Sequence, residues 1–141
     1  MRTAFICPNL QFVYKFNGVD KAALCTDAMR GAGMPDGESI LGSLTNGQKV
    51  IIEDGVAKLP DRSAFAGSVA TADRLVRTMI NIAGIPLIDA IRMITLTPAR
   101  ILHVDSQKGS LEEGKDADIV IFDNQINVTT TISKGHVIYN Q

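Results

Sequence analysis

The sequence predicts an α/β fold in which a helix-rich part, residues 1–104, precedes a strand-rich tail, residues 105–141. Residues 9–26 follow the helix-turn-strand order of one half of a βα repeat. Residues 69–101 carry apolar side chains at helical spacing. Residues 118–139 contain short apolar and β-branched runs separated by turn residues, which is typical of strands.

The chain begins with a helix predicted over residues 9–17, and Gly18 stands where that helix would stop. Residues 22–26 then predict a buried strand, because small and apolar side chains follow one another without a charge. This strand ends at Asp27. The residues that define the apolar face of the helix are Leu10, Val13 and Tyr14.

A glycine-rich loop over residues 29–37 leads into a predicted meander. Residues 48–53 and 56–59 predict two paired strands, because the Asp-Gly pair between them is a strong signal for a two-residue turn. Residues 61–68 form a second loop. The sequence therefore places a β-hairpin between the first strand and the later helices.

Three helices are predicted next. Ser68 is suited to cap a helix over residues 69–83. Pro86 opens the second helix, and Thr97 and Pro98 are suited to the cap and first position of a short third one. The Thr-Pro pair thus marks the end of the helix-rich part.

The tail is predicted to be mostly strand. Gly109 and Gly114 bracket a tight turn. Strands follow at residues 118–122, 128–133 and 136–139.

Composition excludes several classes of function. The 141 residues carry 14 basic and 15 acidic side chains and a formal net charge of −1, which gives no reason to bind nucleic acid or an anionic membrane. No apolar run is long enough for a membrane span or typical of a signal peptide. Cys7 and Cys25 form no disulfide framework and no zinc spacing. We therefore expect a cytoplasmic, reduced protein without nucleic-acid or membrane partners.

Asp27 is the sharpest catalytic candidate. It ends an apolar strand and precedes a glycine-rich loop, and in α/β barrels the catalytic residues lie at this C-terminal end of the strands. A carboxylate there can take a proton from water and hand it to a leaving amine. The alternative is an aspartate that caps the loop or the next helix. The residue pattern alone leaves both interpretations open.

Several motifs occur in a fixed order. They are Thr26-Asp27-Ala28, the Asp54-Gly55 hairpin, Ala66-Gly67-Ser68, Thr97-Pro98-Ala99-Arg100 and the glycine-bounded segment 109–118. From about residue 6 to the end, this series resembles the N-acetylglucosamine-6-phosphate deacetylases of the amidohydrolase superfamily. The later motifs are shared widely among amidohydrolases. The first motif combined with Ala66-Gly67-Ser68 points to the deacetylases.

The resemblance implies the last part of a (β/α)8 barrel with a β-hairpin insertion up to residue 104, and strands of a small β-sandwich over 105–141. It implies hydrolysis of the acetamide of N-acetylglucosamine 6-phosphate to glucosamine 6-phosphate and acetate. Asp27 is then general base and later general acid. Phe65, Ala66 and Gly67 line the sugar pocket through position and backbone. Without the resemblance, Ala66 and Gly67 belong to a simple turn before a helix cap.

The family binds a divalent metal of the zinc or iron type through a glutamate and two histidines of earlier barrel strands, and nothing in this chain corresponds to those strands. His103 and His136 follow Asp27 in the sequence and are predicted to be surface or capping residues. Phe5 stands where the resemblance implies a substrate-binding histidine. We therefore expect this chain alone to bind no metal and to be inactive.

Similarity to the family stops abruptly within residues 1–5, which suggests a truncated deacetylase with either an altered reading frame or an artificially added N-terminus. Unpaired strand edges and uncovered helix faces then predict a homo-oligomer. Two alternatives stay open. One is part of another amidohydrolase, similar to dihydroorotase or imidazolonepropionase. The other is a non-catalytic, self-associating remnant. Metal analysis would separate the two, because an enzyme with an intact site should retain stoichiometric metal and a remnant should not.

Overall fold

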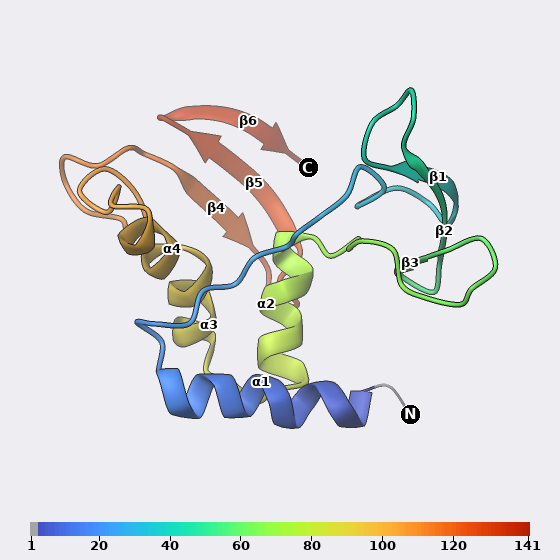
Figure 1. Ribbon diagram of the computed structural model, residues 1–141. Helices are drawn as coiled ribbons and strands as arrows, with labels where there is room; N and C mark the ends of the chain where they lie inside the picture. Colours follow the sequence, from blue (N-terminus) through green and yellow to red (C-terminus); the bar gives the residue numbers. More distant parts are fainter. Residues whose placement is uncertain (1–2) are drawn as a thin grey trace. The chain divides into compact units, whose positions relative to one another are not determined.

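The structure is a computed structural model that describes residues 3–141, with side chains from residue 8 onward (Figure 1). Helices and β-strands both occur, which confirms the α/β class. The elements in chain order are α1 (Thr3–Asn17), β1 (Gly37–Leu41), β2 (Gln48–Glu53), β3 (Val56–Lys58), α2 (Ala72–Asn81), α3 (Leu87–Ile94), α4 (Leu96–Ile101), β4 (Ile119–Phe122), β5 (Val128–Ser133) and β6 (His136–Asn140). No helix of this described part combines the length and apolar character needed to cross a membrane.

Contacts divide the chain into two compact units. The first contains Met1–Leu24 and Val76–Gln141, and the second contains Cys25–Leu75. The predicted boundary at residue 104 concerns a different division, between barrel and sandwich, and it stays a prediction. Each unit has its own hydrophobic core.

The helices of the first unit surround one core. Its buried residues are Ala22, Val76, Met79, Ala83, Ile85, Ala90, Met93 and Ile126. Leu10 and Tyr14 of α1 pack against this core, whereas Val13 stays 44% exposed. The Tyr14 hydroxyl donates to Asp89 of α3 at 2.5 Å, and the pKa of Tyr14 is raised by this hydrogen bond. The predicted end of the first helix at Gly18 is confirmed, although α1 begins earlier than predicted, at Thr3.

Two predicted helix caps are wrong. The hydroxyl of Ser68 accepts a hydrogen bond from the amide of Ala70 at 3.1 Å, which makes a local turn, and α2 begins only at Ala72. Thr97 lies inside α4 and is 1% exposed. Its hydroxyl donates to the Val19 carbonyl at 2.7 Å, so it satisfies a distant carbonyl instead of the start of its own helix.

The predicted strand at residues 22–26 is also wrong, because this segment is extended but has no strand pairing. The amide of Leu24 donates to the carbonyl of Met93 at 2.8 Å. Cys25, predicted to be buried, is exposed. A strand needs a neighbouring strand on at least one side, and residues 3–141 provide none here.

The tail forms an antiparallel sheet in the order β4-β5-β6, which confirms the three predicted strands. Asp116 and Asp118 both bind the Lys108 ammonium, at 2.7 Å and 2.5 Å. Asp118 also accepts a hydrogen bond from the amide of Lys134 at 2.8 Å. These contacts lower the pKa of Asp118 and tie the loop before β4 to the β5–β6 turn.

The second unit is built on a sheet in the order β1-β2-β3. The predicted hairpin is confirmed, with β2 and β3 joined by a two-residue turn. β1 was not predicted, and it pairs antiparallel with β2 across its whole length. The buried residues of this core are Met29, Val50, Ile52, Ala57, Ala66 and Val69.

Candidate functional site

Asp27 follows the extended segment and has φ +45°. Aspartate tolerates this left-handed conformation better than most residues do. The side chain is exposed. Immediately after it, Ala28 pairs in parallel with Ser68, and the amide of Met29 donates to the Ser68 carbonyl at 2.8 Å. Asp27 therefore lies at the start of a short pairing with the segment that ends the second loop.

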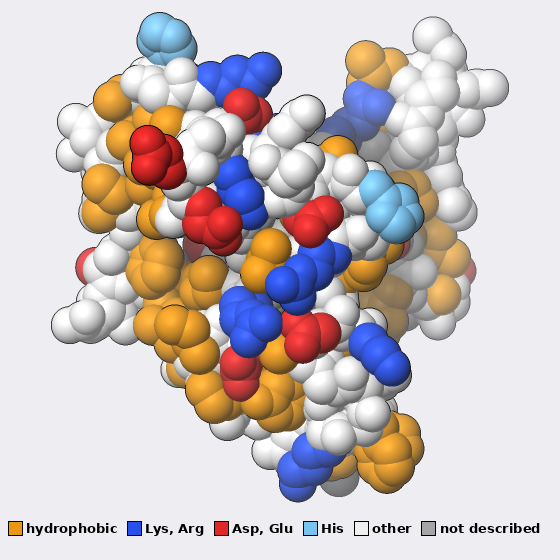
Figure 2. Space-filling view, turned by 90° about the vertical axis from the view of Figure 1, so that its left-hand side faces the viewer, with side chains coloured by type: hydrophobic (Ala, Val, Ile, Leu, Met, Phe, Trp, Pro, Cys, Tyr) orange, Lys and Arg blue, Asp and Glu red, His pale blue; other side chains and the backbone are white. Residues whose placement is uncertain are grey.

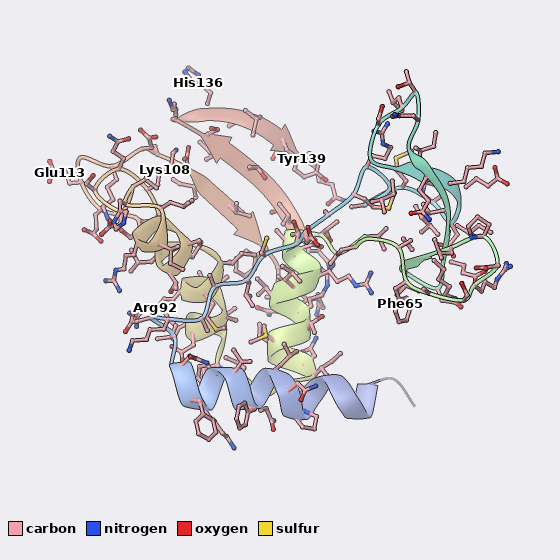
Figure 3. All side chains as sticks on the ribbon, in the orientation of Figure 1. Phe65, Arg92, Lys108, Glu113, His136 and Tyr139 are labelled. Carbon is pink, nitrogen blue, oxygen red and sulfur yellow. The ribbon has the colours of Figure 1, made fainter. Side chains whose placement is uncertain are left out.

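The second loop is held against β3 by its backbone. Phe65 pairs antiparallel with Lys58, and the amide of Ala66 donates to the carbonyl of Ala57 at 3.0 Å. Ala66 is 6% exposed, whereas Phe65 is 62% exposed and extends outward from the loop (Figure 3). Gly67 has φ +86°, and a Cβ atom there would lie 3.0 Å from Leu41 Cδ1, so the position favours glycine.

These pairings bring the predicted site residues into one neighbourhood. Asp27 directly precedes Ala28, and Gly67 directly precedes Ser68, which is the partner of Ala28 in the parallel pairing. All of these residues belong to the second unit. The two site motifs, far apart in sequence, thus lie side by side.

A carboxylate missed by the sequence reasoning fixes the loop. Glu53 of β2 accepts hydrogen bonds from Arg62 Nε and Nη2, both at 3.0 Å, and from Lys58 Nζ at 2.7 Å. Arg62 and Lys58 together hold the pKa of Glu53 down at about 2. The Leu59 amide also donates to Ala64 at 2.9 Å, which closes the loop before Phe65. Glu53 and Arg62 are nine residues apart, and only the hairpin and its following turn bring them together.

The Glu53 cluster makes part of the stability acid-sensitive. Because the folded pKa of Glu53 lies below its ordinary value of 4.5, its contribution is fully present above that value and is lost as pH falls toward about 2. We expect Glu53→Gln to lower the melting temperature at neutral pH, and we expect this deficit to shrink below pH 4.5. Thermal melts of both proteins across a pH series test this. A deficit that is constant with pH would contradict it.

The described residues do not form a metal centre. Among the side chains described, from residue 8 to 141, no three His, Cys, Asp or Glu residues come together in a way that could hold an ion. His103 is exposed with φ +57°, and His136 is exposed at the start of β6 (Figure 3). Both histidines are therefore surface residues, as predicted. They do not supply the ligands of a hydrolytic metal site.

Comparisons with known proteins identify relatives over most of the chain. The Amidohydrolase family matches residues 19–138. The N-acetylgalactosamine-6-phosphate deacetylase of Escherichia coli O157:H7 is 39% identical over 118 residues, which are 84% of this chain and 30% of that protein. The N-acetylglucosamine-6-phosphate deacetylase of Lysinibacillus sphaericus is 38% identical over 128 residues, which are 91% of this chain and 32% of that protein.

A solved structure agrees with these relatives. It is a Mycobacterium smegmatis N-acetyl-D-glucosamine-6-phosphate deacetylase in which one aspartate is replaced by alanine, in complex with N-acetyl-D-glucosamine-6-phosphate. It is 28% identical with a TM-score of 0.82, and the match covers 98% of this chain and 35% of that one. The chain spans about a third of the length of each of these three proteins. The predicted likeness to part of a deacetylase fold is confirmed.

Proposed function

Because this chain belongs to the amidohydrolase family, we propose that it carries part of the active site of an amino-sugar 6-phosphate deacetylase. In this proposal Asp27 is the acid–base residue, and Phe65, Ala66 and Gly67 line the sugar pocket. The parallel pairing of Ala28 with Ser68 supports it, because it sets the two motifs beside each other.

The proposed role of Asp27 is proton transfer. Its carboxylate takes a proton from the water that attacks the acetamide carbonyl, and it then gives that proton to the nitrogen as the C–N bond breaks. Acetate and the free amine of the sugar phosphate are the products. An exposed carboxylate with a fixed backbone is available for both steps. Phe65 offers the exposed apolar surface against which a sugar ring can pack.

The substrate we propose is N-acetylglucosamine 6-phosphate. The Lysinibacillus relative and the Mycobacterium structure support this choice. A second candidate is the C4 epimer, N-acetylgalactosamine 6-phosphate, because the Escherichia coli relative is named for it and is equally similar. The two sugars differ in the orientation of one hydroxyl group, so a shared site for the acetamide and phosphate serves both hypotheses.

The site is tested by binding. Titration of the isotope-labelled chain with N-acetylglucosamine 6-phosphate should shift the amide NMR signals of Asp27, Phe65 and Gly67 more than those of the tail sheet. A second titration uses N-acetylgalactosamine 6-phosphate, and a control titration uses glucose 6-phosphate, which lacks the acetamide. Shifts confined to other segments, or equal shifts with all three sugars, would contradict the proposal.

We also propose that the activity needs a divalent metal of the zinc or iron type, and that this chain alone binds none. The described residues supply no group of three ligands, and without a metal the water that Asp27 would deprotonate is not activated. We expect no hydrolysis of N-acetylglucosamine 6-phosphate by the pure chain with added zinc or iron, measured as released amine. Asp27→Asn is the matched control. Turnover in the parent chain that this variant abolishes would overturn the prediction.

We propose a homo-oligomer in the cytoplasm. Large apolar side chains reach the surface of the first unit, including Phe12 and Phe16, whose tilted rings have centroids 4.2 Å apart. Acidic and basic side chains alternate on the face displayed in Figure 2, so no single-sign patch there opposes self-association. Burial of apolar surface between copies is the driving force expected for such an assembly.

A further inference from the structure

The loop that leads to the proposed sugar-lining residues contributes little to a hydrophobic core. Residues 59–64, between β3 and Phe65, are called the sugar-site loop below. Residues 60–65 are all exposed, and Leu59 at the start of the loop packs only partly against the core of the second unit. Burial of apolar surface therefore does not determine the conformation of this loop. Its order depends on polar contacts, which can be altered without removing the core.

Two backbone hydrogen bonds close the sugar-site loop. The amide of Leu59 donates to the Ala64 carbonyl at 2.9 Å, and the amide of Arg62 donates to the Leu59 carbonyl at 2.8 Å. Arg62 has φ +60°, a left-handed conformation that residues with a long side chain rarely adopt. The loop thus contains a strained residue, and such a residue persists only where the surrounding contacts hold it in place.

Glu53 supplies contacts that hold Arg62. Its Oε2 atom accepts a hydrogen bond from Arg62 Nη2 at 3.0 Å, and its Oε1 atom accepts one from Arg62 Nε at 3.0 Å. This bidentate geometry fixes the orientation of the guanidinium as well as its distance. The side chains of Glu53 and Lys58 are only 27% and 13% exposed, so water screens this cluster less than it screens an ordinary surface ion pair.

The same carboxylate is linked to the backbone beside Phe65. Lys58 Nζ donates to Glu53 Oε1 at 2.7 Å, and the backbone of Lys58 pairs antiparallel with Phe65. Arg62 therefore ties the middle of the sugar-site loop to Glu53, and Lys58 ties its base to the same residue. Phe65, which extends outward from this base, follows directly after the two ties (Figure 3).

We propose that Glu53 and Arg62 are positioning residues for the sugar site. Their ion pair holds the sugar-site loop in one conformation, so that Phe65 and the two residues after it are already in place when the sugar arrives. A preformed loop loses less conformational freedom on binding, and the ion pair thereby raises the affinity for the sugar without touching it. This inference rests on the proposed function, because it requires these three residues to line the pocket.

Arg62→Gln tests the positioning role, because it removes the ion pair and keeps a polar side chain. Nitrogen relaxation NMR of the free chain should show greater mobility at the amides of Ser63, Ala64 and Phe65. The affinity for N-acetylglucosamine 6-phosphate, from the NMR titration, should fall about threefold to tenfold. Glu53→Gln should have the same two effects, since it breaks the pair from the other side. Circular dichroism checks that both variants fold.

Lys49→Gln is the matched control. Lys49 is exposed on β2, the strand that carries Glu53, and its replacement removes the same positive charge from the chain. It should leave the mobility of the loop unchanged and should affect the affinity for the phosphorylated sugar only through net charge. Arg62→Lys keeps the charge but not the bidentate geometry, so it should restore only part of the affinity that Arg62→Gln loses.

Three outcomes overturn the positioning role. They are a loop in Arg62→Gln that is as ordered as in the parent chain, a mobile loop with the parent's sugar affinity, and equal losses of affinity in Arg62→Gln and Lys49→Gln. A parent chain that binds neither amino-sugar phosphate is a different result. It would contradict the proposed function and with it the effect on affinity, whereas the mobility of the loop would still show whether Glu53 and Arg62 order it.

Discussion

Replacing Met93 by alanine should lower the free energy of unfolding by about 2–5 kcal/mol. Met93 is 2% exposed and belongs to the core shared by α2, α3 and the segment before Leu24. Truncation removes apolar contacts and leaves a cavity that the rigid neighbours fill only partly. The loss should appear as a lower urea midpoint in a denaturation curve followed by far-ultraviolet circular dichroism, because most helical residues belong to the first unit.

Met34→Ala is the control for that experiment. Met34 lies in the loop before β1 and is 63% exposed, so its truncation removes little buried surface. Its effect on unfolding should stay within about 0.5 kcal/mol. Similar effects of the two substitutions would show that Met93 is not packed as the structure describes.

Hydrophobic periodicity and turn residues correctly predicted those helices and strands whose formation depends on residues close together in the sequence. The Asp54-Gly55 pair marks the β2–β3 turn, because both residues adopt positive φ and this pair is suited to that conformation. The helical stripe of α2 and the alternation with turns in the tail also gave correct elements. The predicted start of α2 at Ser68 was wrong because the Ser68 hydroxyl accepts a hydrogen bond from the amide of Ala70 in a local turn and does not cap the helix.

Elements that depend on distant partners were not predictable in this way. Residues 22–26 have the composition of a strand, but strand formation requires a neighbour, and the described chain offers none. β1 shows the opposite case. Residues 37–41 have little strand character by themselves, and their pairing with β2 creates the strand.

The same distinction between local signals and distant partners applies to the candidate site. The order of motifs pointed to Asp27 and to residues 65–67, but no local pattern showed that the two segments pair side by side. The Glu53–Arg62 ion pair was missed for the same reason, since it exists only after the hairpin and loop have formed. The available signal was a carboxylate at the end of the first strand of the predicted hairpin and an arginine in the loop that follows it.

The second large effect is expected at Gly109, in the turn between α4 and β4. It has φ +92°, and a Cβ atom there would lie 2.8 Å from Ala99 Cβ, 2.9 Å from Leu96 Cα and 3.1 Å from the Thr95 carbonyl oxygen. Two of these neighbours are backbone atoms of α4 and its cap, which cannot move aside as a flexible side chain could. The turn therefore requires glycine for both its conformation and its close approach to the helix.

Gly109→Ala should accordingly lower the free energy of unfolding on the order of 2–4 kcal/mol, since left-handed strain and the clash with α4 add together. Gly114→Ala separates these two causes. Gly114 has φ +88° in the same loop, but a Cβ atom there would meet nothing within 4 Å, so only the conformational cost of about 1–2 kcal/mol remains. Urea denaturation of both variants measures the difference. If the two alanines cost the same, the loop does not pack against α4, and the tail sheet is attached to the helices by other contacts.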